Sequence, residues 1–251
     1  METIGRICAR RNLGGNMVLF GVEVSPRSLA AFRAGQYVHL EWVNPPVPEA
    51  AGEGRSLFVA SPPGELPFLT FITRTGDSPF KRCLERLKEG APVRITGPFG
   101  SFTLPEGLGG PAWLSPIVLV PEGIGISAAR SLVLDGIPRA PTTPFFLFSL
   151  ARRQEVLPFR SEWMEVVRKH PRFRFEEIFL GPGEGEIPEA EEDPGDRILP
   201  RLFEVVRERE IRQAEFYLSG SLGVVESIRG ALLCAGIRSE RIHAEACLGG
   251  D

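Results

Sequence analysis

The chain has 251 residues, enough for one large or two ordinary domains that each bury a core. Its 43% hydrophobic and 24% charged residues are typical of a globular protein, and a net charge of -3 without a dense basic stripe argues against nucleic-acid binding. No apolar run approaches the roughly 20 residues of a membrane-spanning helix, and the N-terminus lacks the pattern of a secretory signal, so we expect a cytoplasmic protein.

The cysteines and histidines form no recognisable metal-binding or catalytic pattern. The four cysteines lie too far apart for a zinc or iron–sulfur motif, and the three histidines have no companion at catalytic spacing. We therefore expect no bound metal. These residues are Cys8, Cys83, Cys234, Cys247, His39, His170 and His243.

Short apolar runs broken by glycine and proline fill the first half of the chain. Runs of this length and spacing are typical of strands and favour a small antiparallel β-barrel. One helix is expected among them, at Pro79–Lys88, with Asp77 or Ser78 as its N-cap, because its apolar residues recur at helical spacing. The six expected strands are Thr3–Arg11, Met17–Val24, Tyr37–Val43, Ser56–Ser61, Leu66–Arg74 and Arg94–Thr96.

The centre of the chain carries a strand, a glycine turn and a helix in that order. Ile117–Val120 is the strand, Gly123-x-Gly125 the turn and Ser127–Leu134 the helix. This order presents backbone N–H groups and the positive end of a helix dipole to an anion such as a pyrophosphate. The same pattern also occurs in crossovers that bind nothing. The glycine-rich Leu104–Gly110 just before it is the expected boundary between domains 1–107 and 112–251.

Strands and helices alternate through the rest of the chain, which indicates a doubly wound parallel sheet with ligands at the carboxyl ends of its strands. Polar or glycine-rich segments follow four of these strands. They are Glu122–Gly125, Arg152 with Arg153, Ser219–Gly223 and Glu245. The expected strands are Phe145–Ser149, Phe173–Leu180, Ala214–Leu218 and Arg241–Ala246, and the expected helices are Phe159–Lys169, Ile198–Glu208 and Val224–Ala235.

The order of four segments, Gly35–Tyr37, Arg55–Ser61, Gly76–Phe102 and Val118–Ser127, resembles the ferredoxin–NADP reductase family. The resemblance runs from about Ile4 to about Glu245 and is strongest to the short bacterial NAD(P)H–flavin reductases without a fused iron–sulfur domain. It implies a flavin-binding barrel (1–107), an NAD(P)-binding α/β domain (112–251), and FAD and NAD(P)H as cofactors.

The family's flavin strand, Arg-x-Tyr-Ser-x-x-Ser, matches this chain at Arg55 and Ser61. Leu57 and Phe58 replace the tyrosine and the first serine, and Phe58 offers an aromatic surface instead. An arginine can bind a pyrophosphate bidentately, although an exposed arginine without a ligand fits the same position. The resemblance implies FAD contacts at Arg55, Leu57, Phe58, Val59, Ser61, Phe71, Ile72, Thr73, Gly76, Asp77 and Ser78.

The family's two nucleotide motifs correspond to Glu122–Ala128 and Ser219–Val224. Glu122 departs from the pattern and brings a carboxylate near the expected pyrophosphate, where it repels the ligand. Arg152 and Arg153 are expected at the ribose or a 2′-phosphate, or else in a solvated loop. The implied nucleotide contacts are Gly123, Ile124, Gly125, Ile126, Ser127, Gly220, Ser221 and Leu222.

Two positions are the expected catalytic ones. Ser219 replaces a cysteine that lies by the nicotinamide in the family, and Glu245 matches a terminal acid on the flavin side, although a surface acid is the alternative. Cys247 replaces an aromatic residue, which leaves the flavin face open or covered by Leu248–Asp251.

The resemblance implies hydride transfer from NAD(P)H to FAD. The chain lacks the cysteines of an iron–sulfur cluster, so the acceptor is expected to be separate, either a ferredoxin-like protein or a small molecule. Two alternatives remain: a reductase-like flavoprotein subunit or scaffold that has lost pyridine-nucleotide turnover and serves electron transfer or regulation in a complex, and a protein for another phosphate ligand. Gly181–Asp196, with seven acids and no base, is expected to be a mobile loop or a docking surface for a basic partner.

Overall fold

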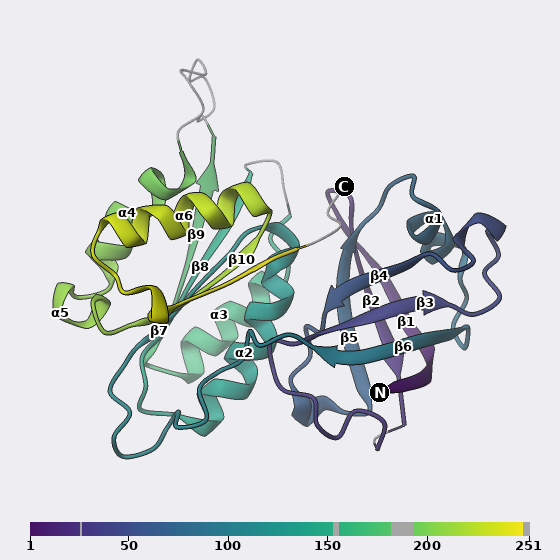
Figure 1. Ribbon diagram of the computed structural model, residues 1–251, viewed down its shortest axis with the longest axis horizontal. Coiled ribbons are helices and arrows are strands. Elements are labelled where there is room, and N and C mark those ends of the chain that lie inside the picture. Colours follow the sequence, from purple (N-terminus) through teal and green to yellow (C-terminus); the bar gives the residue numbers. More distant parts are fainter. Residues whose placement is uncertain (26, 153–155, 182–192, 248–251) are drawn as a thin grey trace.

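The computed structural model describes residues 1–25, 27–152, 156–181 and 193–247. Two sheets lie side by side, one from each half of the chain (Figure 1). The first is antiparallel with six strands, and the second is parallel with five strands and helices on both faces. The predicted fold class is therefore confirmed. None of the helices in these ranges is long and apolar enough to cross a membrane.

Each of the six strand-like runs of the first half forms a strand, and the sheet order is β4-β3-β6-β1-β2-β5. Ala60, just beyond β4, donates its N–H to the carbonyl of Thr70 in β5 at 2.7 Å, so the two edges of the sheet meet. The sheet encloses aromatic rings, with the centroids of Phe20 and Phe71 5.2 Å apart. The strands are β1 (Glu2–Gly14), β2 (Met17–Glu23), β3 (Tyr37–Trp42), β4 (Gly54–Phe58), β5 (Phe68–Arg74) and β6 (Pro92–Phe99).

Helix α1 (Pro79–Arg86) covers one end of this sheet. Ser78 is its N-cap, and the side-chain oxygen accepts the N–H of Lys81 at 3.4 Å. The predicted apolar stripe is buried, and the Phe80 ring stacks on Trp42 with centroids 4.4 Å apart. Two short 3₁₀ helices, η1 (Pro48–Ala50) and η2 (Pro63–Glu65), lie in the loops of this half.

The second sheet has the order β11-β10-β7-β8-β9. From β7 the chain first adds β8 and β9 on one side of the sheet, and then crosses back to add β10 and β11 on the other side. The topological switch point, where the direction of strand addition reverses, therefore lies between β7 and β10. Its strands are β7 (Ile117–Pro121), β8 (Phe145–Arg152), β9 (Phe173–Leu180), β10 (Glu215–Gly220) and β11 (Ile242–Ala246).

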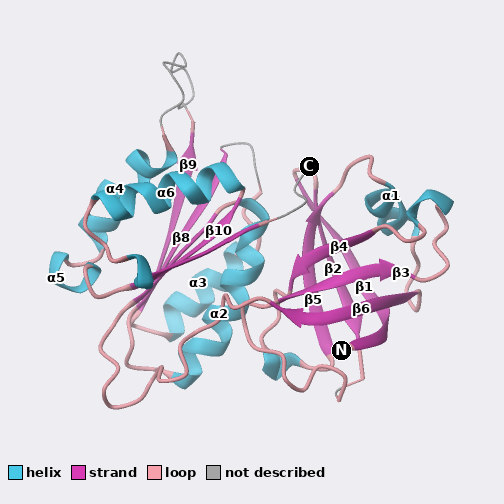
Figure 2. Cartoon of the chain, in the orientation of Figure 1, coloured by secondary structure: helices cyan, strands magenta, loops and turns pink. Residues whose placement is uncertain are grey.

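Helices cover both faces of this sheet, as Figure 2 shows. Alternate residues of β7 pack on opposite sides: Leu119 joins the cluster that contains Trp163, and Val118 joins the cluster that contains Ile228. The first cluster also includes Phe58 of the N-terminal sheet, so the two halves share a hydrophobic core. The helices are α2 (Ile126–Arg139), α3 (Arg160–Lys169), α4 (Pro194–Val205), α5 (Glu208–Ile211) and α6 (Leu222–Cys234), with short 3₁₀ turns η3 (Gly123–Gly125) and η4 (Ser239–Arg241).

Several predicted boundaries differ from the observed ones, and three of them change the type of structure assigned to a segment. The expected loop Gly181–Asp196 ends in helix α4, because the Asp193 carboxylate accepts the N–H groups of Gly195 and Asp196 and caps it. The expected helix Ile198–Glu208 is divided into α4 and α5. Arg152 is the last residue of β8 and not part of a loop, because β8 stays paired with β9 up to that residue. Residues 182–192 lie outside the described residues.

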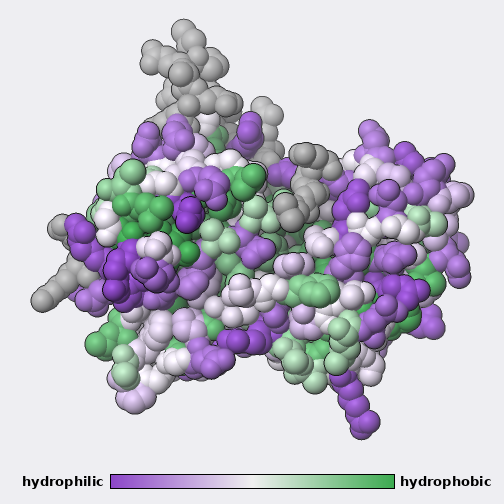
Figure 3. All heavy atoms as spheres, in the orientation of Figure 1, coloured by the Kyte–Doolittle hydropathy of each residue, from purple (hydrophilic) through white to green (hydrophobic). Residues whose placement is uncertain are grey.

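The face drawn in Figure 3 mixes hydrophilic and hydrophobic residues over both halves. Its hydrophobic residues form small groups separated by hydrophilic ones, as on an ordinary protein surface. Among the described residues, no three His, Cys, Asp or Glu side chains are arranged to hold a metal ion.

Candidate functional site

The switch point brings the two predicted glycine segments into direct contact. The N–H of Glu122 donates to the carbonyl of Ser219 at 2.7 Å, and the Ser219 hydroxyl donates to the carbonyl of Gly125 at 3.0 Å. A Cβ on Gly125 would lie 2.4 Å from the Ser219 oxygen, so only glycine fits there. The segment after β7 and the carboxyl end of β10 therefore form one continuous crevice floor.

Two helices begin at this crevice, α2 directly after Gly125 and α6 directly after Ser221. Neither helix is capped by the side chain of its own N-cap residue. Backbone N–H groups and helix dipoles at a switch point are the usual elements of an anion site in an α/β sheet. Here the N–H of Gly125 already donates to the carbonyl of Glu122, and the N–H of Ser221 donates to the Glu122 carboxylate. The predicted order of strand, glycine turn and helix is thus present twice, once from β7 to α2 and once from β10 to α6, and β7 and β10 are adjacent strands.

A narrow slot lies between this crevice and the N-terminal sheet. Its volume is about 70 Å³. It brings together the predicted flavin strand, the predicted nucleotide turn and the end of β11, which are separate in the sequence. The lining residues are Tyr37, Ser56, Leu57, Phe58, Ile72, Ile124, Ser127, Glu245, Ala246 and Cys247.

The lining of this slot suits a planar, mostly apolar ring with polar edges. Leu57, Phe58 and Ile72 supply apolar walls, and the buried Ser127 hydroxyl has no hydrogen-bond partner among the described residues. An unpaired buried hydroxyl costs about 1–3 kcal/mol, which a bound polar group would offset. The slot is nevertheless smaller than the roughly 300–1,000 Å³ of a typical ligand pocket, so a ring of flavin size must widen it to enter.

The end of β11 brings an acid and a thiol into the slot. Burial raises the pKa of the Glu245 carboxyl. Burial, followed by the negative charges of Glu122 and Glu245, raises the pKa of the Cys247 thiol to about 12, so the thiol is uncharged at neutral pH. The N–H of Cys247 donates to the carbonyl of Gly220 at 2.8 Å and holds this segment against β10.

The expected phosphate-binding residues lie on β4 and before α1. Arg55 is partly buried, donates to the carbonyl of Gly54 at 2.8 Å and lies 3.5 Å from a carboxylate oxygen of Glu53. Gly76 has φ +157, and a Cβ there would lie 3.5 Å from the buried Lys81 ammonium. Lys81 was not predicted, although its position three residues after the N-cap Ser78 is a local signal for a cation at this helix start.

Several predicted contact residues are held inside the protein. Val59, Phe71 and Ile126 are buried in hydrophobic clusters, so only their backbone groups can reach a ligand. The Ser61 hydroxyl accepts the N–H of Thr70 at 3.0 Å. Thr73 is also buried, whereas Asp77, Arg152, Ser221 and Leu222 are exposed. Arg153 lies outside the described residues.

Helix α2 is fixed to the flavin strand by two side chains that sequence reasoning missed. Arg130 donates to both carboxylate oxygens of Glu162 at 2.7 and 2.8 Å and to the carbonyl of Ala60 at 2.9 Å. Its guanidinium carbon also lies 4.9 Å from the centroid of the Phe159 ring. Ser131 donates its hydroxyl to the carbonyl of Ser61 at 2.9 Å. Since α2 begins at the glycine turn, these bonds set the distance between turn and strand.

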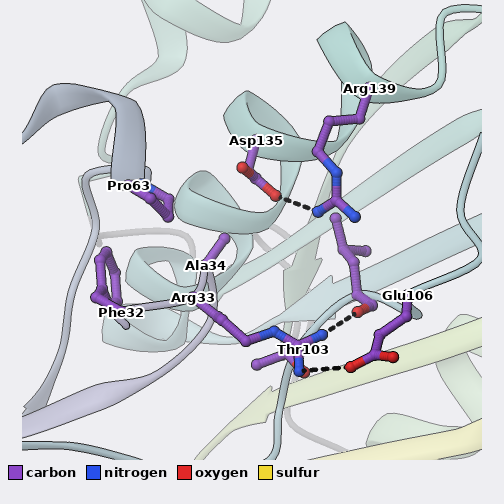
Figure 4. A pocket seen from close by; sticks show the side chains of 9 residues that line it. Phe32, Arg33, Ala34, Pro63, Thr103, Glu106, Asp135 and Arg139 are labelled. Carbon is purple, nitrogen blue, oxygen red and sulfur yellow. Dashed lines mark hydrogen bonds and ion pairs between the residues drawn. The ribbon is translucent and has the colours of Figure 1, made fainter. Parts of the chain in front are cut away.

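A larger hollow of about 420 Å³ lies at the opposite end of α2 (Figure 4). Its arginines face acids: Arg139 is 2.7 Å from Asp135, and Arg33 is 3.6 Å from Glu106. These pairs leave little charge to select an ionic ligand, and none of the predicted site residues lines this hollow. We therefore place the candidate site at the smaller slot, because the predicted site residues line it, although the other hollow is larger.

Comparison with known proteins identifies the family of the chain. The ferredoxin–NADP reductase B of Sorangium cellulosum is 30% identical over 201 residues, which cover 70% of this chain and 78% of that protein. The chain belongs to the ferredoxin–NADP reductase family. The expected resemblance is thus confirmed, and the cofactors of this family are FAD and NAD(P)H.

Two further proteins show a partial likeness, one in sequence and one in fold. The reductase component of phenol 2-monooxygenase from Pseudomonas sp. is 28% identical over 57% of this chain, which spans only 38% of that protein. The crystal structure of an Amycolatopsis cytochrome P450 reductase matches the fold with a TM-score of 0.81 at 22% identity, over 100% of this chain and 71% of that one. No family model matches the chain.

Proposed function

We propose that this protein is a flavin-dependent oxidoreductase that takes a hydride from NAD(P)H and passes electrons to a separate acceptor. One observation carries the proposal: Leu57, Phe58 and Ile72 of the first half and Ile124 and Ser127 of the second line a single slot. In this proposal residues 1–107 hold FAD and residues 112–251 hold the nucleotide, which matches the cofactors of the family.

The bound flavin would supply the redox chemistry, accepting a hydride from the dihydronicotinamide and releasing the electrons to the acceptor. The protein would bind and orient the reactants. Arg55 and Lys81 would neutralise the FAD pyrophosphate, the side chains of the slot would enclose the ring, and the Ser127 hydroxyl would donate to its polar edge. Ser219 would act as a positioning residue, because its hydroxyl is already bonded to Gly125.

The acceptor is proposed to be a ferredoxin-like protein or a small molecule. Among the relatives, one is named a ferredoxin–NADP reductase and several are named reductase components of monooxygenases. All of these names describe reductases, but they name different electron-transfer partners. They therefore support an electron-transfer function for this chain and do not indicate which acceptor it uses.

The test is an anaerobic absorption experiment on the purified chain reconstituted with FAD. We expect retained flavin, with bleaching of its visible band on adding NADH or NADPH, at a rate that saturates with nucleotide concentration. A chain that takes up no FAD after reconstitution would overturn the assignment.

A second candidate is a flavoprotein subunit or scaffold without nucleotide turnover. Glu122 favours it, because its carboxylate lies within the crevice where an anionic ligand would bind. In the same experiment this candidate predicts a yellow protein that dithionite reduces but neither nucleotide does.

A further inference from the structure

The side chain of Glu122 occupies an unusual place in the crevice. Its carboxylate oxygen Oε2 accepts the N–H of Ser221 at 2.8 Å. Ser221 is the N-cap residue of α6, and its own side chain makes no capping bond. A residue from the end of β7 thus caps a helix that begins about 100 residues later in the chain.

The backbone around Glu122 holds this carboxylate in position. Its N–H donates to the carbonyl of Ser219 at 2.7 Å, and its carbonyl accepts the N–H of Gly125 at 3.0 Å. Gly220 has φ +153, and a Cβ there would lie 2.7 Å from the Glu122 Cβ and 2.8 Å from Oε2. Only a glycine at 220 leaves room for this side chain, so the two residues form a matched pair.

The carboxylate satisfies the electrostatic preference of the α6 start. A helix N-terminus favours a negative charge, and a carboxylate there stabilises the helix. The same N–H groups and dipole would otherwise attract the diphosphate of a dinucleotide bound at the switch point. A diphosphate in this crevice must therefore displace the carboxylate or bind beside a like charge, and both reduce its affinity.

We propose that Glu122 is a built-in competitor that weakens the binding of the NAD(P) diphosphate in this crevice. The inference rests on the proposed function. It assigns to one residue the control of nucleotide affinity. The guanidinium of Arg74 would lie 2.9 Å from a Cβ on Gly123, so a cation lies beside the glycine turn that precedes α2.

The test uses Glu122→Gln in the FAD-loaded protein. The amide oxygen of glutamine can still accept the Ser221 N–H, so the cap persists while the charge disappears. We expect the Kd for NAD+ and for NADP+, measured by titration calorimetry, to fall about fivefold, and the difference from wild type to shrink at 0.5 M salt because it is Coulombic. Glu226→Gln, on the exposed face of α6, makes the same change in net charge and should leave both Kd values unchanged.

An unchanged or higher Kd in Glu122→Gln overturns the inference, and a rise would mean that the carboxylate contacts the nucleotide favourably. This failure differs from failure of the proposed function. If the wild-type flavin is reduced by NAD(P)H and the variant binds no tighter, only the inference fails. If neither protein binds NAD+ or NADP+ nor is reduced, both fail. Thermal unfolding of the variant within about 2 °C of wild type checks that the cap is intact.

Discussion

The starts of helices α1 and α6 are built from similar local sequences and have opposite charges beside them. Gly76-Asp77-Ser78 precedes α1, and Gly220-Ser221 precedes α6, with a positive φ at each glycine. The α1 start lies beside the ammonium of Lys81, whereas the α6 start already holds the carboxylate of Glu122. We therefore expect the nearest side-chain charge, and not the glycine turn or the helix dipole alone, to decide which of the two starts binds an anion.

The two helix starts can act on one reaction only if the halves of the molecule keep their relative position. Arg130 is one of the residues that link the two halves. Replacing Arg130 with Met leaves the Glu162 charge and the Ala60 carbonyl without their donor. We expect the free energy of unfolding in urea to fall by about 3 kcal/mol. Arg139→Met, which removes an exposed pair from the same helix, should cost less than about 0.5 kcal/mol. Equal losses would show that Arg130 has no special role.

The match between Gly220 and Glu122 gives the next largest effect. Gly220→Ala should lower stability by about 2 kcal/mol, because the new Cβ meets the Glu122 side chain and the backbone is strained. In a Glu122→Gly background the backbone strain and a 3.2 Å contact with the carbonyl oxygen of residue 122 remain, but the two closer side-chain contacts disappear. The loss should therefore be at least about 1 kcal/mol smaller. Urea unfolding of the wild type, the two single variants and the double variant gives the coupling energy between positions 122 and 220. A coupling energy near zero would contradict the steric fit between Gly220 and the Glu122 side chain.

Lys81 tests the other side of the comparison. Lys81→Met keeps the buried stem and removes the charge, and we expect the Kd for FAD to rise about tenfold, because a charge-assisted contact to the pyrophosphate is lost. Fluorescence titration of the FAD-free protein measures it. Lys88→Met, in the exposed segment after α1, is the control and should not change the Kd. A similar shift in both variants would point to a general effect of net charge.

Ser127 gives the smallest expected effect, with opposite signs for binding and stability. Ser127→Ala removes an unpaired buried hydroxyl, so the FAD-free protein should become more stable by about 0.5–1 kcal/mol while its Kd for FAD rises about fivefold. Ser131→Ala removes a buried hydroxyl that is bonded to Ser61 and should instead lose about 1 kcal/mol. Loss of stability in both variants would mean that the Ser127 hydroxyl already has a partner.

Sequence patterns located the elements of the fold but not all of their ends. The alternating run Arg94–Thr96 extends to β6 (Pro92–Phe99) because ladders to β1 and β3 continue it, and such pairing is not encoded locally. The start of α4 did have a local signal, Asp193 followed by Pro194, but the density of acids before it favoured a loop. The ends of β6 were therefore missed because tertiary pairing sets them. The start of α4 was missed because the acidic composition outweighed its capping signal.

In the candidate site, too, some features could be predicted from the sequence and others depend on tertiary contacts. The glycine turn after β7 and the Arg55 strand were found from sequence because backbone geometry and the resemblance both marked them. The resemblance also placed Glu122 near the expected pyrophosphate, but its bond to Ser221 depends on the order of strands in the sheet. Arg130 appeared as an ordinary residue of an apolar helix, since the carbonyl that it binds lies 70 residues away.

The open edge of the parallel sheet has a consequence for how the protein behaves at high concentration. β9 is an outer strand of eight residues, and an unprotected strand of that length is a template for pairing with another molecule. Glu176 and Glu177 lie in its middle and bind Arg201 and Arg160, so a second copy aligned on this strand would meet fixed charges. We therefore expect these two ion pairs to disfavour pairing of β9 with a second molecule.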